Sequence, residues 1–293
     1  MLKLSKLGVP GAATLRCLTR RQNDIDGKPA NQQVSRAQTL WDAKGGSKDG
    51  TVAFAEVKQL LADVCVGTKL CNYCEQGEAT DVEHIYPKSF FPKRTFQWPN
   101  YLLACSTCNS HYKGDKFAVF PPTQPTVAVE LKRGQPAPCD DAAFIDPRLE
   151  NPMKYLWLDL LEGTYQLRVH HDLIDPRDIA KAEHTLRILQ IGERRSLADP
   201  RGAAFQFFQA QLERYEQIGK ATTWGALEKL ARDPHLVDRT NPLNAERQRM
   251  MDGLKAYILG YPHPTVWHEM KRQRQWLPKT GQLFAAVPEA LLW

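Results

Sequence analysis

Long apolar runs are missing from this sequence. Nowhere do its 293 residues approach the run of about 18 apolar positions that a membrane-spanning helix needs. The basic N-terminal stretch MLKLSKLGVPGAATLRCLTRRQ contains no continuous apolar core of signal-peptide length. We therefore expect a cytoplasmic protein without a membrane segment or membrane partner, a transit peptide being the alternative for the basic stretch.

The cysteines do not suggest a disulfide framework, because there are seven of them, an odd number. Cys17, Cys65 and Cys139 are scattered, and we expect them to be buried as small apolar side chains. The other four stand in Cys-x-x-Cys pairs. This arrangement favours metal-bound thiolates in a reducing compartment.

Internal repeats and low-complexity tracts are also missing. With 42% hydrophobic and 25% charged residues, the composition is that of a globular protein of one large or two modest domains. The net charge of +6 is compatible with a polyanionic partner, because lysine and arginine release counterions from phosphates.

The two Cys-x-x-Cys pairs bracket one stretch of the sequence. They consist of Cys71 and Cys74, and of Cys105 and Cys108. Four such thiolates can close a structural, tetrahedral zinc site with no position left open for chemistry. The 30 residues at 75–104 exceed the loop of a simple zinc ribbon, so we expect a folded insert. Gly77 is expected to let the chain turn after the first pair.

The insert and the residues after it predict two strands and a helix. DVEHIYP alternates as a strand does, and Pro87 ends it. FQWPNYLLAC is a second apolar run, and CNSHYKGDKF begins a helix on which Asn109 and Lys113 share one face. This part of the chain is therefore predicted to be a ββα unit.

The polar residues of this unit suit a metal-dependent phosphodiesterase. Such an enzyme needs a hard cation on oxygen ligands, a base that works near pH 7 and a group that orients the base. Glu83 and Asn109 offer oxygen donors, and His84 is the candidate base. The side-chain amide of Asn100 can tie the loop to the strand.

Three questions remain open for this site. Ideal strand alternation sends Glu83 and His84 to opposite faces, so both serve one phosphate only if the chain bends or the substrate straddles the strand edge. Asp81 either orients His84 or is exposed. His111 either touches the metal or a phosphate, or is an exposed helix residue, which we favour.

These residues resemble the HNH family of nucleases, also called ββα-metal nucleases. The family has an Asp/Glu-His pair on its first strand, a later Asn and a final His or Asn on the helix, and many members add two Cys-x-x-Cys pairs as a zinc site. Asp81-Val82-Glu83-His84-Ile85-x-Pro87, Asn100 and Cys105-x-x-Cys108-Asn109 match these parts. The sequence departs from the family in having Asn at the last metal position and one extra residue before Lys113.

The resemblance implies a metal-dependent endonuclease that hydrolyses phosphodiester bonds. His84 would be the general base, Glu83 and Asn109 would bind a catalytic Mg²⁺ or Mn²⁺, and Asn100 would orient His84. Lys113 would contact phosphate. The expected substrate is DNA, and RNA is left open.

A looser resemblance extends to CNYCE, EHIYPKS and Asp146-Pro147, which are similar to the Septu and retron-associated HNH proteins of bacterial anti-phage defence. It implies an antiviral role beside a partner ATPase of the ABC/SMC-like class. The rival interpretation is a non-catalytic, zinc-stapled module that binds nucleic acid or protein.

Basic and aromatic residues alternate between residues 88 and 98. We expect Lys88, Lys93 and Arg94 to contact nucleic-acid phosphates, with neighbouring phenylalanines packing or stacking on bases. Arg187, Arg194, Arg195, Arg201 and Arg214 in the C-terminal part belong either to a similar groove or to a solvated face.

The fold as a whole is predicted to be α+β and mostly helical. Residues 1–34 are interpreted as a polar arm, 35–43 as a helix capped by Ser35, and 52–64 as a helix because its apolar residues recur every three or four positions. Lys44 to Gly50 is expected to be a loop.

The rest of the chain divides into a connector and helices. Prolines exclude regular structure from 118–143 apart from a short extended piece at 127–131, and 155–169 alternates as a hairpin. From about 177 the pattern is helical, with an apolar stripe that includes Phe205, Phe208, Leu212 and Tyr215. The predicted parts are residues 1–64, the nuclease module 65–120, and the connector with the C-terminal domain 121–293.

Overall fold

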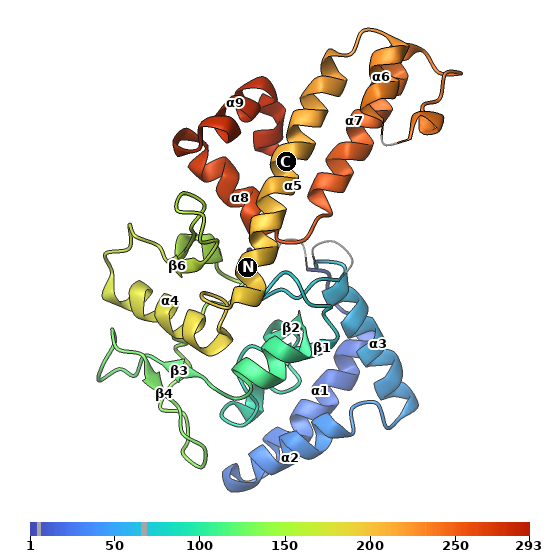
Figure 1. Cartoon of the computed structure of the whole chain (residues 1–293). Helices are drawn as coiled ribbons and strands as arrows, with labels where there is room; N and C mark the ends of the chain where they lie inside the picture. Colours follow the sequence, from blue (N-terminus) through green and yellow to red (C-terminus); the bar gives the residue numbers. More distant parts are fainter. Residues whose placement is uncertain (5–6, 66–68, 232) are drawn as a thin grey trace. The chain divides into compact units, whose positions relative to one another are not determined.

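The computed structural model describes residues 1–4, 7–65, 69–231 and 233–293. These residues form two compact units, Met1–Trp157 with Gln166–Arg194, and Leu158–Tyr165 with Arg195–Trp293. The structure is mixed α+β and mostly helical, as predicted, with small two-stranded sheets (Figure 1). In the described part of the chain, no helix is long and apolar enough to span a membrane.

The division into two units differs from the predicted parts 1–64, 65–120 and 121–293. The connector and the helix after it belong with the cysteine-rich segment, and the boundary falls at Arg194. One reason is Arg148 on the connector, whose Nη1 donates to the carbonyl oxygens of Trp98 (2.8 Å) and Tyr101 (2.5 Å). These hydrogen bonds join the segment around Arg148 to the cysteine-rich segment.

The first unit begins with three helices where the sequence predicted two. They are α1 (Ala12–Asp26), α2 (Ala30–Asp42) and α3 (Lys48–Ala62). Helix α1 replaces most of the predicted polar arm. Its polar side chains are buried because they bind backbone groups: Arg21 donates to the carbonyls of Leu40 (3.1 Å) and Lys44 (3.0 Å).

The predicted starts of α2 and α3 need correction. Ser35 does not cap α2, since it lies inside the helix and its Oγ donates to the carbonyl of Gln32 (2.9 Å). Helix α3 begins at Lys48, inside the predicted loop, because Ser47 caps it by accepting the N–H of Gly50 (3.2 Å).

The cysteine-rich segment contains the predicted pair of strands. Strand β1 (Asp81–His84) pairs with β2 (Tyr101–Ala104) in antiparallel register, with His84 opposite Tyr101. The helical segment after β2 is a π-helix, Thr107–Lys113, instead of an α-helix. The N–H of Gly114 reaches the carbonyl of Asn109, five residues back, at 2.7 Å.

One apolar core joins the three helices to the strands. Trp41 of α2 meets Phe54 of α3 edge to face at 5.4 Å between ring centroids, and both pack with Val82 and Tyr101. Burial of each large side chain in such a core stabilises the fold by about 1.5–3 kcal/mol. The core therefore holds β1 and β2 against the N-terminal helices.

The connector carries a small sheet, β3 (Ala118–Val119) with β4 (Val129–Glu130), where a short extended piece was predicted. The predicted hairpin is present as β5 (Leu156–Leu158) and β6 (Leu167–Val169), and α4 (Pro176–Leu189) follows.

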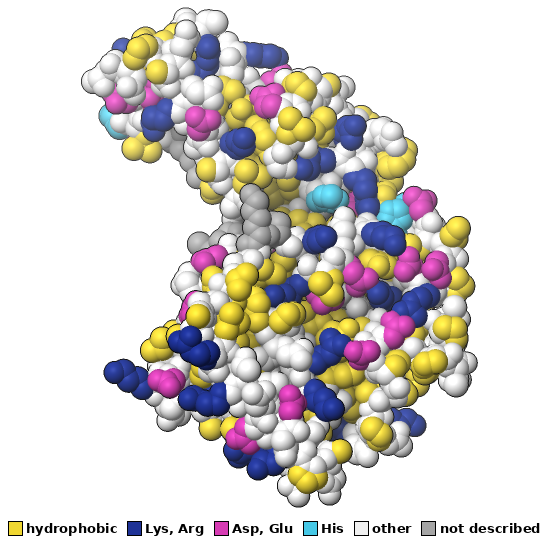
Figure 2. Space-filling model, turned by 180° about the vertical axis from the view of Figure 1, so that it is seen from behind, with side chains coloured by type: hydrophobic (Ala, Val, Ile, Leu, Met, Phe, Trp, Pro, Cys, Tyr) yellow, Lys and Arg dark blue, Asp and Glu magenta, His cyan; other side chains and the backbone are white. Residues whose placement is uncertain are grey.

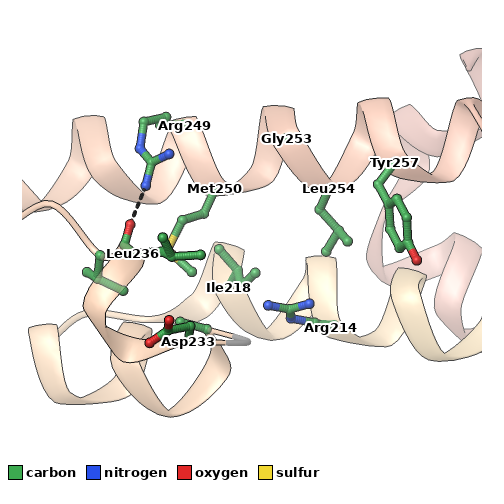
Figure 3. Close-up of a pocket in the computed structure, with 11 residues that line it drawn as sticks. Arg214, Ile218, Asp233, Leu236, Arg249, Met250, Gly253, Leu254 and Tyr257 are labelled. Carbon is green, nitrogen blue, oxygen red and sulfur yellow. Dashed lines mark hydrogen bonds between the residues drawn. The ribbon is translucent and has the colours of Figure 1, made fainter.

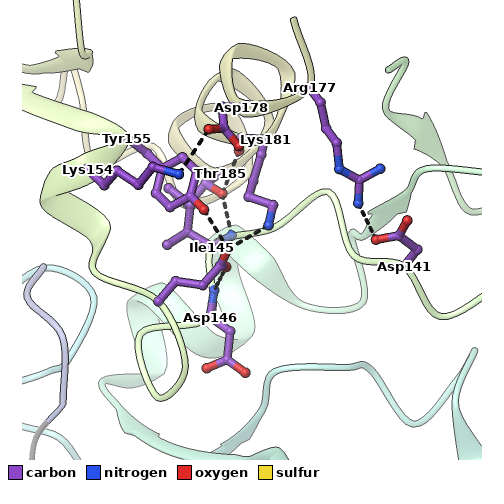
Figure 4. A network of polar contacts seen from close by, with 10 residues as sticks. Asp141, Ile145, Asp146, Lys154, Tyr155, Arg177, Asp178, Lys181 and Thr185 are labelled. Carbon is purple, nitrogen blue, oxygen red and sulfur yellow. Dashed lines mark hydrogen bonds and ion pairs between the residues drawn. The ribbon is translucent and has the colours of Figure 1, made fainter. Parts of the chain in front are cut away.

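Helix α4 is fastened to the connector by polar contacts. Thr185 accepts the N–H of Ile145 at 3.0 Å, and Lys181 pairs with Glu150 at 2.7 Å (Figure 4). The same Glu150 carboxylate accepts the hydroxyl of Tyr155 at 2.7 Å. These contacts place α4 and the connector in one unit.

The second unit is helical. It contains α5 (Arg195–Lys220), α6 (Trp224–Leu230), α7 (Leu243–Leu259), α8 (Pro264–Gln273) and α9 (Pro278–Ala286). Helices α6 to α9 each pack on α5. The predicted stripe on α5 faces this core, since Phe208, Leu212 and Tyr215 are buried and Phe205 is half-buried.

Candidate metal centre and active site

The four paired cysteines meet in one buried cluster. Cys71 and Cys74 lie in the turn before β1, Cys105 directly follows β2, and Cys108 lies in the first turn of the π-helix. The antiparallel pairing of β1 with β2 brings the two pairs together. All four Sγ atoms lie within 4.8 Å of one another, so the cluster could hold zinc, as predicted.

The sulfur geometry fits this metal. Zinc–sulfur bonds of about 2.3 Å in a tetrahedron place the sulfurs about 3.8 Å apart, and the Sγ atoms of Cys74 and Cys105 are 3.9 Å apart. Sharing of hydrogen bonds with Cys105 lowers the pKa of Cys74 well below its usual value and raises the pKa of Cys71 and Cys108. A bound cation would hold all four sulfurs as thiolates.

The backbone of the first cysteine pair has two special positions. Glu75 adopts the left-handed conformation, with φ at 60°. The chain bends at Gly77, as predicted, without a positive φ at this glycine. A Cβ at Gly77 would lie 3.1 Å from the Cβ of Cys105 and 3.2 Å from its Sγ. The glycine is there because the second cysteine pair leaves no room for a side chain.

An arginine from the end of the first unit contacts the cluster. Arg194 donates from Nη2 to the Sγ of Cys108 at 3.6 Å, and its guanidinium lies 4.3 Å from the ring centroid of Tyr112. The sequence suggested only a groove or a solvated face for this arginine. Its charge instead offsets part of the negative charge that four thiolates around a divalent ion would carry.

His84 ends β1 and is buried. Its Nε2 lies 2.9 Å from the carbonyl oxygen of Thr95, which can only accept, so Nε2 carries the proton and Nδ1 has the free lone pair. The ring packs against Trp41 at 4.2 Å between centroids. Burial lowers the pKa of His84 to about 3, so the imidazole is neutral at pH 7.

Asn100 ties the residues after β1 to the loop that precedes β2. Its Nδ2 donates to the carbonyls of Tyr86 and Arg94, both at 3.0 Å, and its Oδ1 accepts the N–H of Tyr86 at 2.7 Å. These contacts are the tie between loop and strand that the sequence suggested. One of these contacts is to the carbonyl of Arg94, the residue before Thr95, and the carbonyl of Thr95 lies beside His84.

Glu83 and Lys113 form a buried ion pair. Lys113 is fully buried, and its Nζ lies 2.5 Å from Glu83 Oε1 and 2.8 Å from the carbonyl oxygen of His84. Burial raises the pKa of Glu83, and the charge of Lys113 opposes this shift. Lys113 therefore has no exposed atom with which to make the predicted phosphate contact in this structure.

Asn109 and Asp81 are also hydrogen-bonded to each other. Asn109 Nδ2 donates to Asp81 Oδ2 at 3.1 Å, so Asp81 positions Asn109 instead of His84. His111 is exposed, and its ring lies beside Tyr112. Asp81 thus fits neither of its two alternatives, whereas His111 is exposed as we favoured.

A pocket of about 400 Å³ is lined by three of the four predicted catalytic residues, and Asn100 is not among the residues that line it. Glu83, His84 and Asn109 all line it, together with Trp41 of α2. Strand β1 has a partner on one side only among the described strands, so residues from both of its faces can border a pocket along the open edge. The conflict with strand alternation is resolved in this way.

Of the residues predicted to contact nucleic acid near residues 88–98, only one lines this pocket. Lys88 lines it, whereas Lys93 and Arg94 lie in a short 3₁₀-helix outside it, and Arg94 stacks on Tyr86 and pairs with Asp140. The neighbouring phenylalanines are buried and cannot stack on bases: Phe90, Phe91 and Phe96.

The sequence did not single out several residues around the pocket. Trp41 supports His84 from a distant helix, and Arg133 and Asp115 line the pocket from the connector and from the end of the π-helix. The only available signal was weak: Arg133 lies in a proline-rich connector. Contacts between distant segments placed these side chains.

A different cavity, of about 250 Å³, lies in the second unit between α5, α7 and the segment that joins α6 to α7 (Figure 3). Its floor is apolar, with Ile218, Met250 and Leu254, and Arg214 and Arg249 lie at its edge. The described residues that line it include neither histidine nor cysteine. The catalytic chemistry predicted above has no counterpart there.

Comparison with known proteins returned no relative. No family model matches the chain, and a search of the curated proteins and a search of the solved structures each gave no match. The function therefore has to be inferred from the site itself.

Lys113→Met is expected to destabilise the first unit by about 3–5 kcal/mol, because Glu83 would remain buried without its cation. Hydrogen exchange of peptides covering 81–113 measures this loss as a local free energy of unfolding. The double variant Lys113→Met/Glu83→Gln should recover part of it, and Lys116→Met, at an exposed position, is the control. Unchanged protection in Lys113→Met would show that the ion pair does not stabilise the unit.

Proposed function

We propose that the protein is a metal-dependent endonuclease of the HNH, or ββα-metal, class that hydrolyses phosphodiester bonds in DNA. One observation carries the proposal: Glu83, His84 and Asn109 line a single pocket that is built on the same two strands as the four-cysteine cluster. The β1–β2 pair followed by a helical turn agrees with the order of elements expected for this class.

His84 would act as the general base. Its Nδ1 accepts a proton from water, the water oxygen bonds to phosphorus, and the bond from phosphorus to the 3′ oxygen breaks. The carbonyl of Thr95 supports this role by holding the imidazole in the tautomer with a free Nδ1. Asn100 supports it indirectly, through the backbone of the adjoining Arg94.

Glu83 and Asn109 would hold the catalytic cation. Carboxylate and amide oxygens are the donors that Mg²⁺ and Mn²⁺ prefer, and the two residues border the same pocket, so the donor chemistry fits. The cation would share Glu83 with the ammonium of Lys113. When bound, such an ion stabilises negative charge on the phosphate and on the leaving oxygen.

The zinc cluster would have a structural role only. Its four sulfurs satisfy a tetrahedral ion, and no coordination position is left for substrate. A role in anti-phage defence and a partner ATPase are implied by the sequence resemblance alone. Co-purification of the protein with the products of neighbouring genes tests both.

A nicking assay on supercoiled plasmid tests the proposal. Cleavage is expected with Mg²⁺ or Mn²⁺ and is expected to stop when EDTA removes the cation. RNA of matched length serves as the second substrate. If neither DNA nor RNA is cleaved with any divalent ion, by the chain alone or with a co-purified partner, the non-catalytic binding module is the better interpretation.

A further inference from the structure

The connector contributes a cation to the pocket that contains His84. Arg133 lines this pocket, although it lies 49 positions after His84 in the numbering. The turn that follows β4 places it there. Leu131 donates its N–H to the carbonyl of Phe117 at 2.9 Å, and Gly134 has a φ of +81°, so the chain reverses just after Arg133.

A single acidic residue holds Arg133 in position. Its Nε donates to Oδ2 of Asp115, which follows the π-helix and lines the same pocket. The side chain of Arg133 is 80% exposed, while that of Asp115 is 28% exposed. A guanidinium has five N–H donors in a planar fork, and this contact uses the inner one. The outer part of the fork faces solvent at the pocket.

Besides Arg133 and Asp115, the charged side chains that line the pocket are Asp42, Glu83 and Lys88. Lys88, from the loop after β1, is the other cationic residue among the described residues that line it. Lys88 is half-buried, whereas the side chain of Arg133 is 80% exposed. A phosphate on the exposed side of the pocket would therefore meet the Arg133 guanidinium first.

We propose that Arg133 binds a backbone phosphate of the DNA strand whose scissile phosphate lies at His84. This inference rests on the proposed nuclease function and assigns a substrate-binding role to the connector. It replaces Lys113 as the phosphate contact, because Lys113 is buried and engaged by Glu83. A guanidinium can hold a phosphate with two parallel hydrogen bonds, so Arg133 would also orient the strand.

The test measures binding separately from cleavage. The His84→Ala variant of the full chain is titrated with a fluorescein-labelled duplex of about 20 base pairs, and anisotropy is followed at several salt concentrations. Introducing Arg133→Gln into the His84→Ala protein is expected to raise the Kd for this duplex about tenfold at low salt. A change of this size is usual for the loss of one charge-assisted hydrogen bond. The slope of log Kd against log salt concentration should decrease by about the amount that corresponds to the loss of one phosphate contact.

Lys132→Gln is the matched control. Lys132 is the exposed neighbour of Arg133 and does not line the pocket, so its loss should change binding by less than about twofold. Equal binding by the Arg133 and Lys132 variants would overturn the inference. Circular dichroism of both variants confirms that the fold is retained.

The same data separate this inference from the proposed function. If the wild-type chain cleaves DNA and Arg133→Gln binds it normally, only the role of Arg133 is wrong. If Arg133→Gln loses affinity and the wild-type protein cleaves no nucleic acid, alone or with a co-purified partner, the role of Arg133 in binding stands and the nuclease proposal is wrong.

Discussion

His84→Ala is expected to lower the rate of plasmid cleavage by about 10²–10⁴-fold, the usual contribution of a general base. The variant should still fold and contain zinc. The carbonyl of Thr95 loses the imidazole N–H, but it still accepts the hydroxyl of Tyr101 at 2.8 Å, so no buried acceptor is left without a partner.

Two further variants make this result specific. His84→Gln keeps a side-chain N–H for Thr95 but provides no base, so it should be as inactive as His84→Ala while it disturbs the packing against Trp41 less. His111→Ala removes the exposed histidine of the same segment and should retain activity within about twofold. Cleavage by a folded His84→Gln protein at the wild-type rate would contradict the mechanism.

Cys105→Ser is expected to abolish zinc binding and to unfold the segment that contains β1 and β2. A structural zinc contributes about 10–16 kcal/mol to the folding of small zinc modules, which is as large as the whole stability of a typical domain. Because Val82, Tyr101 and Leu103 pack with the N-terminal helices, the loss should extend into that core. The helical second unit should keep its circular dichroism signal.

Metal analysis and limited proteolysis measure these effects. The wild-type chain should contain one equivalent of zinc and resist cleavage between residues 69 and 117, whereas Cys105→Ser should contain none and be cut there. Cys139→Ser is the control, since this half-buried cysteine lies outside the cluster and its Sγ only donates to the carbonyl of Phe120. A stable, active and zinc-free Cys105→Ser protein would refute a structural role for the metal.

Local patterns predicted the features that depend on neighbouring residues. The spacing of the cysteine pairs predicted a four-sulfur cluster, and the alternation in DVEH predicted β1. The three- and four-residue spacing on α5 correctly predicted its buried face. Such signals are reliable because a turn, a strand or a helix imposes its own period on the side chains that face the core.

Polar residues were harder to place from sequence. Helix α1 was missed because Arg21 and Gln22 are buried through hydrogen bonds to distant backbone groups instead of through an apolar pattern. Lys113 was expected on a helix surface. The segment that contains it is a π-helix, and the Lys113 side chain lies in the interior beside Glu83.

The sequence by itself determined which groups are available: four thiolates in two pairs, an imidazole next to a carboxylate, and an asparagine after the last cysteine. Tertiary structure alone decided what these groups contact. In the folded chain Nε2 of His84 hydrogen-bonds to the carbonyl of Thr95, and Glu83 pairs with Lys113. Arg133 of the connector lines the pocket. The physical reason is that these contacts join backbone and side-chain atoms of distant segments, and their geometry is set only when the core and the hydrogen bonds of Arg148 bring those segments together.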